Sequence, residues 1–140
     1  MDEAKIIPED LVTAKELADL LQQEEYSAQV DEDGEVRVTM GEGTFVYIAI
    51  DTVRRLLKFY TLFRFRPNAP LASKLTLVNR MNDEVIFVRF SMAATDILFT
   101  DYFLSYDGGL LWHQFLRSLA WFSRVAVSAV AEFDEDDLVQ

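Results

Sequence analysis

Two neighbouring stretches carry apolar side chains at both odd and even positions, and they limit what the chain can fold into more than any other feature. Residues 44–50 read TFVYIAI, and residues 55–66 read RLLKFYTLFRFR before Pro67. A strand directs alternate side chains to opposite faces, so both stretches are apolar on two faces, as central strands are. In a chain of 140 residues, this predicts a sheet with helices on one face and a second apolar contact on the other.

The remaining periodicities predict the elements around these strands. Residues 26–30 and 36–40 alternate apolar with polar side chains around DEDGE, which predicts a hairpin with an Asp-Gly turn. Apolar residues at helical spacing predict three helices: one that starts at residue 13 and ends in the glycine-free segment QQEEYSA, one over 71–82 and one over 109–131. Two further strands are predicted at 84–92 and 96–106. The order α-β-β-β-β-α-β-β-α indicates an α+β domain with helices packed on an antiparallel sheet.

The start of the first helix carries a capping signal. Thr13 and Glu16 have the spacing of a capping box, and Val12 and Leu17 flank them as a hydrophobic staple does. Pro8 offers an earlier start. We expect one domain over residues 1–140, with frayed tails at 1–7 and at 132–140, where EFDEDDLVQ is acidic.

Charge and composition exclude several classes of function. Thirteen basic and 24 acidic residues leave a net charge of −11, which disfavours both nucleic acid and anionic membrane surfaces as partners. Cysteine is absent, so disulfides and thiolate chemistry are excluded. The N-terminal MDEAKIIPED does not resemble a signal peptide, and we expect a cytoplasmic protein.

Residues 109–131 form the stretch that most resembles a membrane span. Arg117 and Arg124 lie within it, and each would cost about 3 kcal/mol at the centre of a bilayer. We therefore predict a buried amphipathic helix. Leu111, Phe115, Leu119 and Phe122 form one apolar stripe of this helix, and other apolar side chains lie outside it.

Four stretches in this order resemble the YbjN family of bacterial sensory transduction regulators: FVYIAID, RLLKFYTLFRF, LVNRMNDEVIFVRF and LSYDGGL. The resemblance covers about residues 11–131. It implies a fold similar to that of type III secretion chaperones, which are small, acidic and usually dimeric and which hold extended segments of other proteins. The family has no established reaction, so the resemblance implies a type of partner but no active site.

Asn79 and Asn82 lie where the second helix is expected to end. Asparagine tolerates the left-handed conformation of a helix terminus, so we interpret the pair as structural. The alternative is a pair of amides that grips the backbone of a partner.

His113, Arg117 and Arg124 form a basic stripe on the last helix. We interpret it as a solvated face that pairs with carboxylates of the same chain, such as those of the acidic tail. The alternative is a contact for an acidic partner or a second subunit.

Aromatic residues are concentrated in the second half of the chain. Phe87 and Phe90 have opposite strand parity, as do Phe99 and Tyr102, so both faces of this part of the sheet are predicted to carry rings. If a helix covers one face, the other presents an apolar patch of the kind that marks interfaces. The predicted contacts for an unknown protein client are Phe87, Phe90, Phe99, Tyr102, Tyr106 and Trp112, and we expect a homodimer.

Enzymatic function is not indicated. Gly41-Glu42-Gly43 lacks the residues of a phosphate loop, and His113 is the single histidine, so we expect no catalytic residues, no metal and no cofactor. Asp101 interrupts an apolar strand and is the best candidate for a perturbed pKa, although a water-facing aspartate at a strand edge is the favoured interpretation. The alternative to a protein-interaction module is a small-molecule sensor, with an aromatic pocket between the sheet and the last helix.

Overall fold

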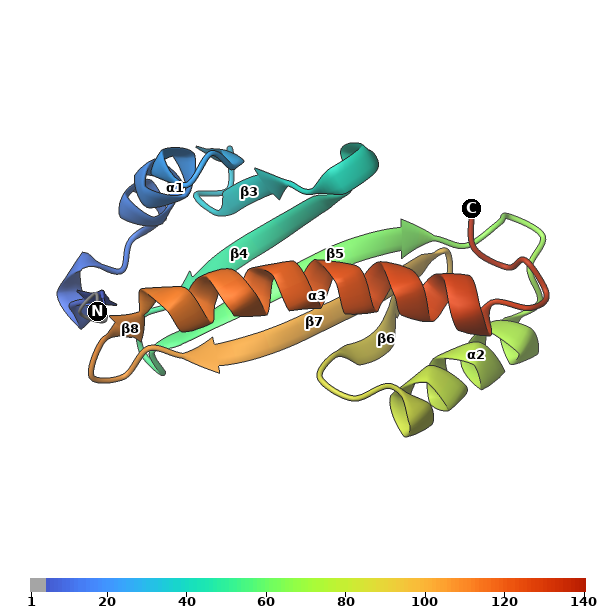
Figure 1. The fold of residues 1–140 in the computed structure, drawn as a ribbon. Coiled ribbons are helices and arrows are strands. Elements are labelled where there is room, and N and C mark those ends of the chain that lie inside the picture. The colour runs from blue at the N-terminus through green and yellow to red at the C-terminus, as the bar shows by residue number, and fades with distance from the viewer. Residues whose placement is uncertain (1–4) are drawn as a thin grey trace. The chain divides into compact units, whose positions relative to one another are not determined.

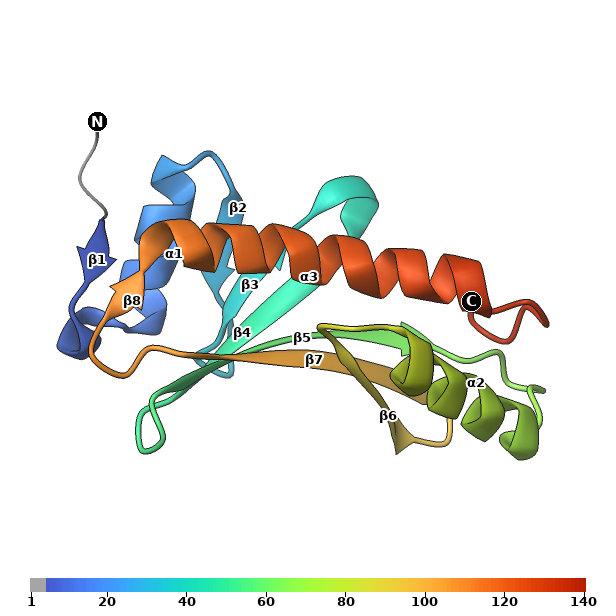
Figure 2. The same cartoon turned by 60° about the horizontal axis from the view of Figure 1, so that its bottom comes forward.

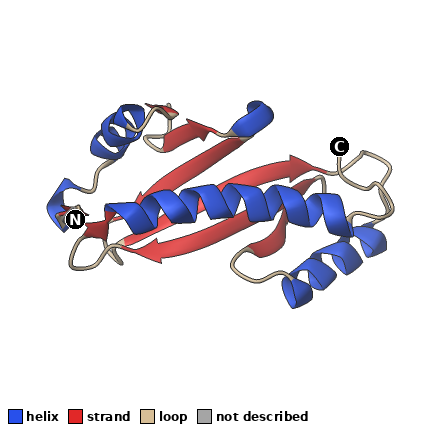
Figure 3. Cartoon of the chain, in the orientation of Figure 1, coloured by secondary structure: helices blue, strands red, loops and turns tan. Residues whose placement is uncertain are grey.

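The computed structural model describes residues 5–140, and these form two compact units. Unit 1 comprises residues 5–59 and 103–120, and unit 2 comprises residues 60–102 and 121–140. Two strands and one helix of the chain run through both units. The elements are shown in Figures 1 and 3. In chain order they are β1 (Ile6–Ile7), α1 (Ala14–Gln23), β2 (Ser27–Val30), β3 (Val36–Thr39), β4 (Phe45–Asp51), β5 (Leu56–Arg64), α2 (Leu71–Glu84), β6 (Arg89–Ala94), β7 (Ile97–Ser105), β8 (Leu110–Leu111) and α3 (Trp112–Phe133), with short 3-10 turns at Glu9–Leu11 and Gly41–Gly43.

The main sheet has the strand order β2-β3-β4-β5-β7-β6. The predicted α+β class and the predicted order of helices and main strands are confirmed, and β4 and β5 are central strands as their two apolar faces indicated. Strands β1 and β8 form a separate antiparallel pair that the sequence did not predict. Across residues 5–140, no helix combines the length and the apolarity that are needed to cross a bilayer.

In unit 1, helix α1 packs on the hairpin of β2 and β3. Thr13 caps the helix, because its hydroxyl accepts a hydrogen bond of 3.2 Å from the Glu16 N–H. In a capping box, the Glu16 side chain would accept a hydrogen bond from the Thr13 N–H in return. Here the Thr13 N–H donates to the Leu11 carbonyl instead. Val12 and Leu17 are buried, as expected for a hydrophobic staple.

The glycine-free end of α1 forms a glycine-type terminus. Glu25 has φ 69°, the Tyr26 N–H donates to the Leu21 carbonyl, and the Glu25 N–H donates to the Gln22 carbonyl. These two bonds define a Schellman motif whose left-handed position is occupied here by a glutamate.

The turn before β8 explains the DGGL stretch. Gly109 has φ 124°, and a Cβ at this position would lie 2.9 Å from a methyl carbon of Ile6. Glycine is therefore required for β1 to pair with β8 at this distance. Ile7 is buried in that pair, so the prediction of a frayed tail at 1–7 is wrong for β1; residues 1–4 of that predicted tail lie outside the described part of the chain.

In unit 2, helix α2 packs beside β6 (Figures 1 and 2). The helix continues to Glu84, two residues beyond its predicted end, and β6 begins only at Arg89. The prediction of a strand over 84–92 is therefore wrong for residues 84–88. Phe87 has φ 83°, a left-handed conformation that a strand cannot include.

The predicted frayed tail at 132–140 is also wrong. The Leu138 and Val139 side chains are buried, and Val139 forms an antiparallel bridge with Phe65. The carboxylate of Asp134 accepts hydrogen bonds from the N–H groups of Leu138, at 2.7 Å, and Val139, at 2.9 Å. Burial of two aliphatic side chains holds this acidic segment in place, and composition alone did not reveal it.

Candidate partner-binding surface

Three rings of unit 2, Phe87, Tyr102 and Trp121, form a partly exposed cluster. Together with the exposed Ile86, which precedes Phe87 in the chain, we call it the aromatic surface. The Phe87 ring stacks on Tyr102 with the ring centroids 4.1 Å apart, and its centroid lies 5.9 Å from that of Trp121, with the ring planes at 67°. Stacked and edge-to-face pairs are both favourable arrangements of aromatic rings. The rings therefore form one ordered cluster that is contributed by three elements of unit 2: the α2–β6 connection, β7 and α3.

The cluster remains accessible to solvent. Trp121 is 44% exposed, and Ile86 is 85% exposed. Phe87 and Tyr102 are half-buried. Tryptophan and tyrosine are enriched among the residues that contribute most to protein–protein binding, because they bury a large area and lose few rotamers. The chemistry of this surface is that of a contact for apolar side chains.

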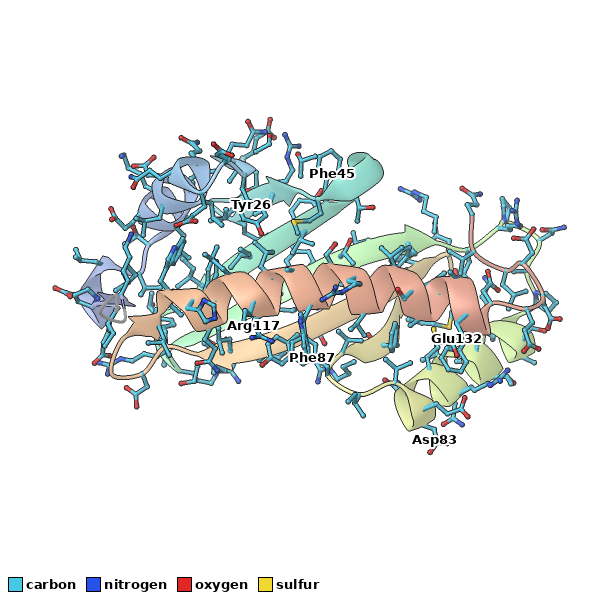
Figure 4. All side chains as sticks on the ribbon, in the orientation of Figure 1. Tyr26, Phe45, Asp83, Phe87, Arg117 and Glu132 are labelled. Atoms are coloured by element: carbon cyan, nitrogen blue, oxygen red, sulfur yellow. The ribbon has the colours of Figure 1, made fainter. Side chains whose placement is uncertain are left out.

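Phe87 is held in an unfavourable backbone conformation at the centre of this surface. A positive φ is rare for a bulky residue and costs on the order of 1–3 kcal/mol. The two ring contacts of Phe87 compensate for part of this cost. The side chain leaves the connection between α2 and β6, as Figure 4 shows.

Half of the predicted contact residues lie at the surface and half do not. Phe87, Phe99 and Tyr102 are half-buried, and Phe99 stacks on Tyr60 with the centroids 5.4 Å apart. Phe99 and Tyr102 lie on opposite faces of β7, as strand parity predicted, whereas the parity argument does not apply to Phe87, which lies outside β6.

The other three predicted contact residues are core residues, and their assignment to a partner contact is wrong. Phe90 is almost completely buried. Tyr106 is buried in unit 1, where its hydroxyl donates to the Asp51 carbonyl and burial raises the pKa of its phenol. Trp112 is buried against Phe115, and its indole N–H donates to a Glu24 carboxylate oxygen.

Trp121 and Ile86 were missed as surface residues. In unit 2, the buried residues of α3 include Phe122, Ala126 and Ala129, which follow the helical spacing of four and three. Trp121 falls outside that spacing, so the helical periodicity contained a signal that it faces outward. Nothing in the sequence placed Ile86 there, because its exposure depends on the left-handed residue that follows it.

Asn82 is structural, as interpreted, but for a different reason. It lies inside α2, and its side-chain amide donates to the Phe90 carbonyl at 2.7 Å and accepts from the Phe90 N–H at 2.8 Å. The pair of bonds imitates a neighbouring strand along the outer edge of β6. Asn79 is exposed on the same helix, so the two amides do not act as a pair.

Asp101 is buried, and the interpretation of a water-facing aspartate is wrong. Its carboxylate forms a bidentate pair with the Arg89 guanidinium at 2.9 and 2.7 Å. This hydrogen-bonded carboxylate raises the pKa of Arg89. The pair spans β6 and β7 and has the geometry of a cross-strand structural contact.

The members of the basic stripe, His113, Arg117 and Arg124, are all exposed on α3, and Arg117 is visible there in Figure 4. The acidic tail forms its ion pairs with other cations, since Glu135 pairs with Arg80 and Asp137 with Arg66. The tail is thus committed to α2 and to the end of β5 rather than to the predicted stripe.

Three open pockets lie away from the aromatic surface. One of about 240 Å³ lies between α2 and the tail, and two of about 470 and 360 Å³ lie in unit 1 near Thr13 and Thr52. Among the described side chains, histidine and carboxylate groups do not gather in the threes that a metal ion would need.

The comparisons with known proteins agree with this fold. The model of the YbjN family, described as "Putative bacterial sensory transduction regulator", matches residues 13–135. A solved structure of YbjN from E. coli, described as "a putative transcription regulator", is similar with a TM-score of 0.75 and 16% identity, over 93% of this chain and 96% of that one. No curated protein matches the chain in sequence.

Proposed function

Because the chain belongs to the YbjN family, we propose that it is a regulatory protein-interaction module without catalytic activity, and that a client protein docks on the aromatic surface of unit 2. The observation that supports this proposal best is the exposure of Trp121 against the stacked pair of Phe87 and Tyr102, with the exposed Ile86 next to Phe87 in the chain. Exposed apolar clusters of this kind mark interaction sites on soluble proteins. A sensor with an aromatic pocket has less support, because Phe87, Tyr102 and Trp121 line none of the three pockets described above.

A homodimer is part of the same proposal. Its support lies on the outer face of β5 and β7 in unit 2, where Tyr60 stacks on Phe99 and where Leu62 is exposed. The opposite faces of these strands carry Thr61 and Thr100, which are buried. Tyr60, Leu62 and Phe99 give this face an apolar region of the kind that a subunit contact uses, beside the ion pair of Arg89 and Asp101.

The first test removes the exposed part of the surface and leaves the core unchanged. We expect Trp121→Ala combined with Ile86→Ser to reduce retention of a client on immobilised protein at least tenfold, because truncation of a tryptophan at a binding hot spot costs about 2 kcal/mol or more and tenfold corresponds to about 1.4 kcal/mol. The measurement is quantitative capture from lysate of the source organism, with thermal melting of each variant to confirm folding.

The matched control for this test is Val127→Ser. Val127 lies on the same helix, is 42% exposed, and points about 120° around the helix axis away from Trp121, which is 44% exposed. The control variant should retain the client as wild type does. Equal losses in both variants, or the same retention by the double variant and wild type, would contradict the proposed surface.

A further inference from the structure

The two outer strands of the main sheet differ in how many of their outward backbone groups are bonded to side chains of the same unit. β2 and β6 are the outer strands. At β6, the outward N–H and carbonyl groups of Phe90 are both bonded to Asn82, and the Lys74 ammonium donates to the nearby Thr95 carbonyl. Helix α2 therefore covers the β6 edge at Phe90, as proteins commonly do to limit pairing with other chains.

At β2 the outward groups can be identified from the ladder. In an antiparallel pair, residues alternate between pointing both backbone groups at the partner strand and pointing both away. The Asp31 N–H donates to the Glu35 carbonyl at 2.8 Å, and the Met40 N–H donates to the Thr44 carbonyl at 2.7 Å. Both bonds lead to the same assignment: the backbone N–H and carbonyl groups of Ala28 and Val30 point away from β3.

One of these outward groups is bonded within the chain, and the others make no hydrogen bond within residues 5–140; the Ala28 side chain is buried. The Gln22 side-chain amide donates to the Ala28 carbonyl at 2.8 Å, which independently confirms that this carbonyl points away from β3. The N–H groups of Ala28 and Val30 and the Val30 carbonyl point outward from the edge strand. Val30 is itself 43% exposed.

The charge around the β2 edge is negative at both ends. Glu24 and Glu25 lie before the strand, and Glu32 and Asp33 lie after it; all four are exposed. Figure 4 shows Tyr26 where α1 leads into β2. A second copy of the chain pairing here would bring these carboxylates against its own, in a molecule of net charge −11. An extended segment that carries lysine or arginine would instead find opposite charge at both ends.

We propose that the β2 edge is a second docking surface, separate from the aromatic surface, which adds an extended basic segment of a partner protein as a further strand. Main-chain hydrogen bonds to Ala28 and Val30 would supply affinity, and the flanking carboxylates would select basic sequences.

The test uses two fluorescent probe peptides that differ only in charge: a seven-residue peptide of alternating lysine and valine, and the same peptide with glutamate in place of lysine. We expect the lysine peptide to bind at least tenfold more tightly than the glutamate peptide, and added salt to weaken it. Equal affinity for the two peptides would overturn the proposal.

Two changes isolate the backbone contact. Val30→Pro removes an N–H that the β2–β3 ladder does not use, and Val30→Thr is the matched control that retains it. We expect at least a tenfold loss of lysine-peptide binding for the proline variant and none for the threonine variant. N-methylation of alternate amides in the peptide, tested on unmodified protein, should cause the same loss even if the proline variant does not fold.

Binding that survives both the Val30→Pro variant and N-methylation of the peptide would overturn the edge as the site. Sedimentation velocity provides a further check, because self-association of the protein that Val30→Pro abolishes would assign the edge to a second copy instead. Trp121→Ala should leave lysine-peptide binding unchanged, so failure of this inference can be told from failure of the proposed function.

Discussion

Asn82 offers both halves of its side-chain amide to one backbone residue, Phe90. Few side chains can do this, because a carboxylate only accepts and an ammonium group only donates. The same requirement explains why two amides near the end of a helix were difficult to interpret from sequence. Helix-ending asparagines are common, whereas an amide that satisfies a strand edge can be identified only once β6 is placed beside α2.

Asn82→Ala should lower the free energy of unfolding by about 1–2 kcal/mol, because the N–H and carbonyl of Phe90 lose their protein partner. Asn79→Ala, on the same helix and exposed, should change it by less than about 0.5 kcal/mol. Urea unfolding of both variants measures the difference, and hydrogen exchange at the Phe90 amide should accelerate only in the first. A loss of the same size in both variants would show that helix propensity, not the amide contact, is responsible.

At the scale of elements, the sequence predicted most of the architecture. Periodicity identified the three helices and the six strands of the main sheet in their order, because each has one buried face with a regular repeat. It failed where conformation depends on distant contacts. Phe87 was predicted to lie in a strand, but it has a left-handed backbone conformation and lies outside β6. The acidic tail was predicted to be frayed, but two buried aliphatic side chains hold it in place.

The candidate surface was predicted less completely than the fold. Three of the six rings assigned to a partner lie at the surface, and Phe90, Tyr106 and Trp112 are buried. Strand parity separates the two faces of a sheet, but it does not show which face a helix covers. That information comes from tertiary packing.

The end of α1 allows a prediction at this same scale. Glu25→Gly should raise the free energy of unfolding by about 0.5–1 kcal/mol, because glycine removes the cost of φ 69° and only part of that gain is lost to the unfolded chain. Glu25→Ala retains the Cβ and removes the carboxylate, so it separates backbone strain from charge. Thermal unfolding checks both variants; stabilisation by alanine equal to that by glycine would show that the strain is not the cause.

At the scale of the whole molecule, net charge governs the response to acid. With a charge of −11, protonation relieves repulsion throughout the chain, and this effect masks the contribution of any one carboxylate. The contribution of Asp51 to stability can be distinguished from this general effect of charge. Its carboxylate accepts from the Arg54 and Val53 N–H groups and from the Arg54 guanidinium, and these bonds, the Arg54 N–H first, lower the pKa of Asp51.

A lowered pKa means that the folded state favours ionised Asp51. Its contribution to stability is therefore present above the unfolded-state pKa, about 3.9, and is lost as the pH falls through the lower folded-state pKa. We expect wild type to be more stable than Asp51→Asn at pH 7, and the difference to shrink as the pH falls below about 4. Urea unfolding at several pH values measures it, and a difference that is independent of pH would contradict this assignment.

The unequal edges of the main sheet also set a limit on polymerisation. Growth of a filament by strand addition needs two free edges on every subunit, so that each incorporated copy can accept another. Within residues 5–140, the outward groups of Phe90 are occupied by Asn82, so a strand cannot be added to β6 at this position unless it displaces that amide. Loss of the Asn82 amide would free both groups for pairing with a further strand.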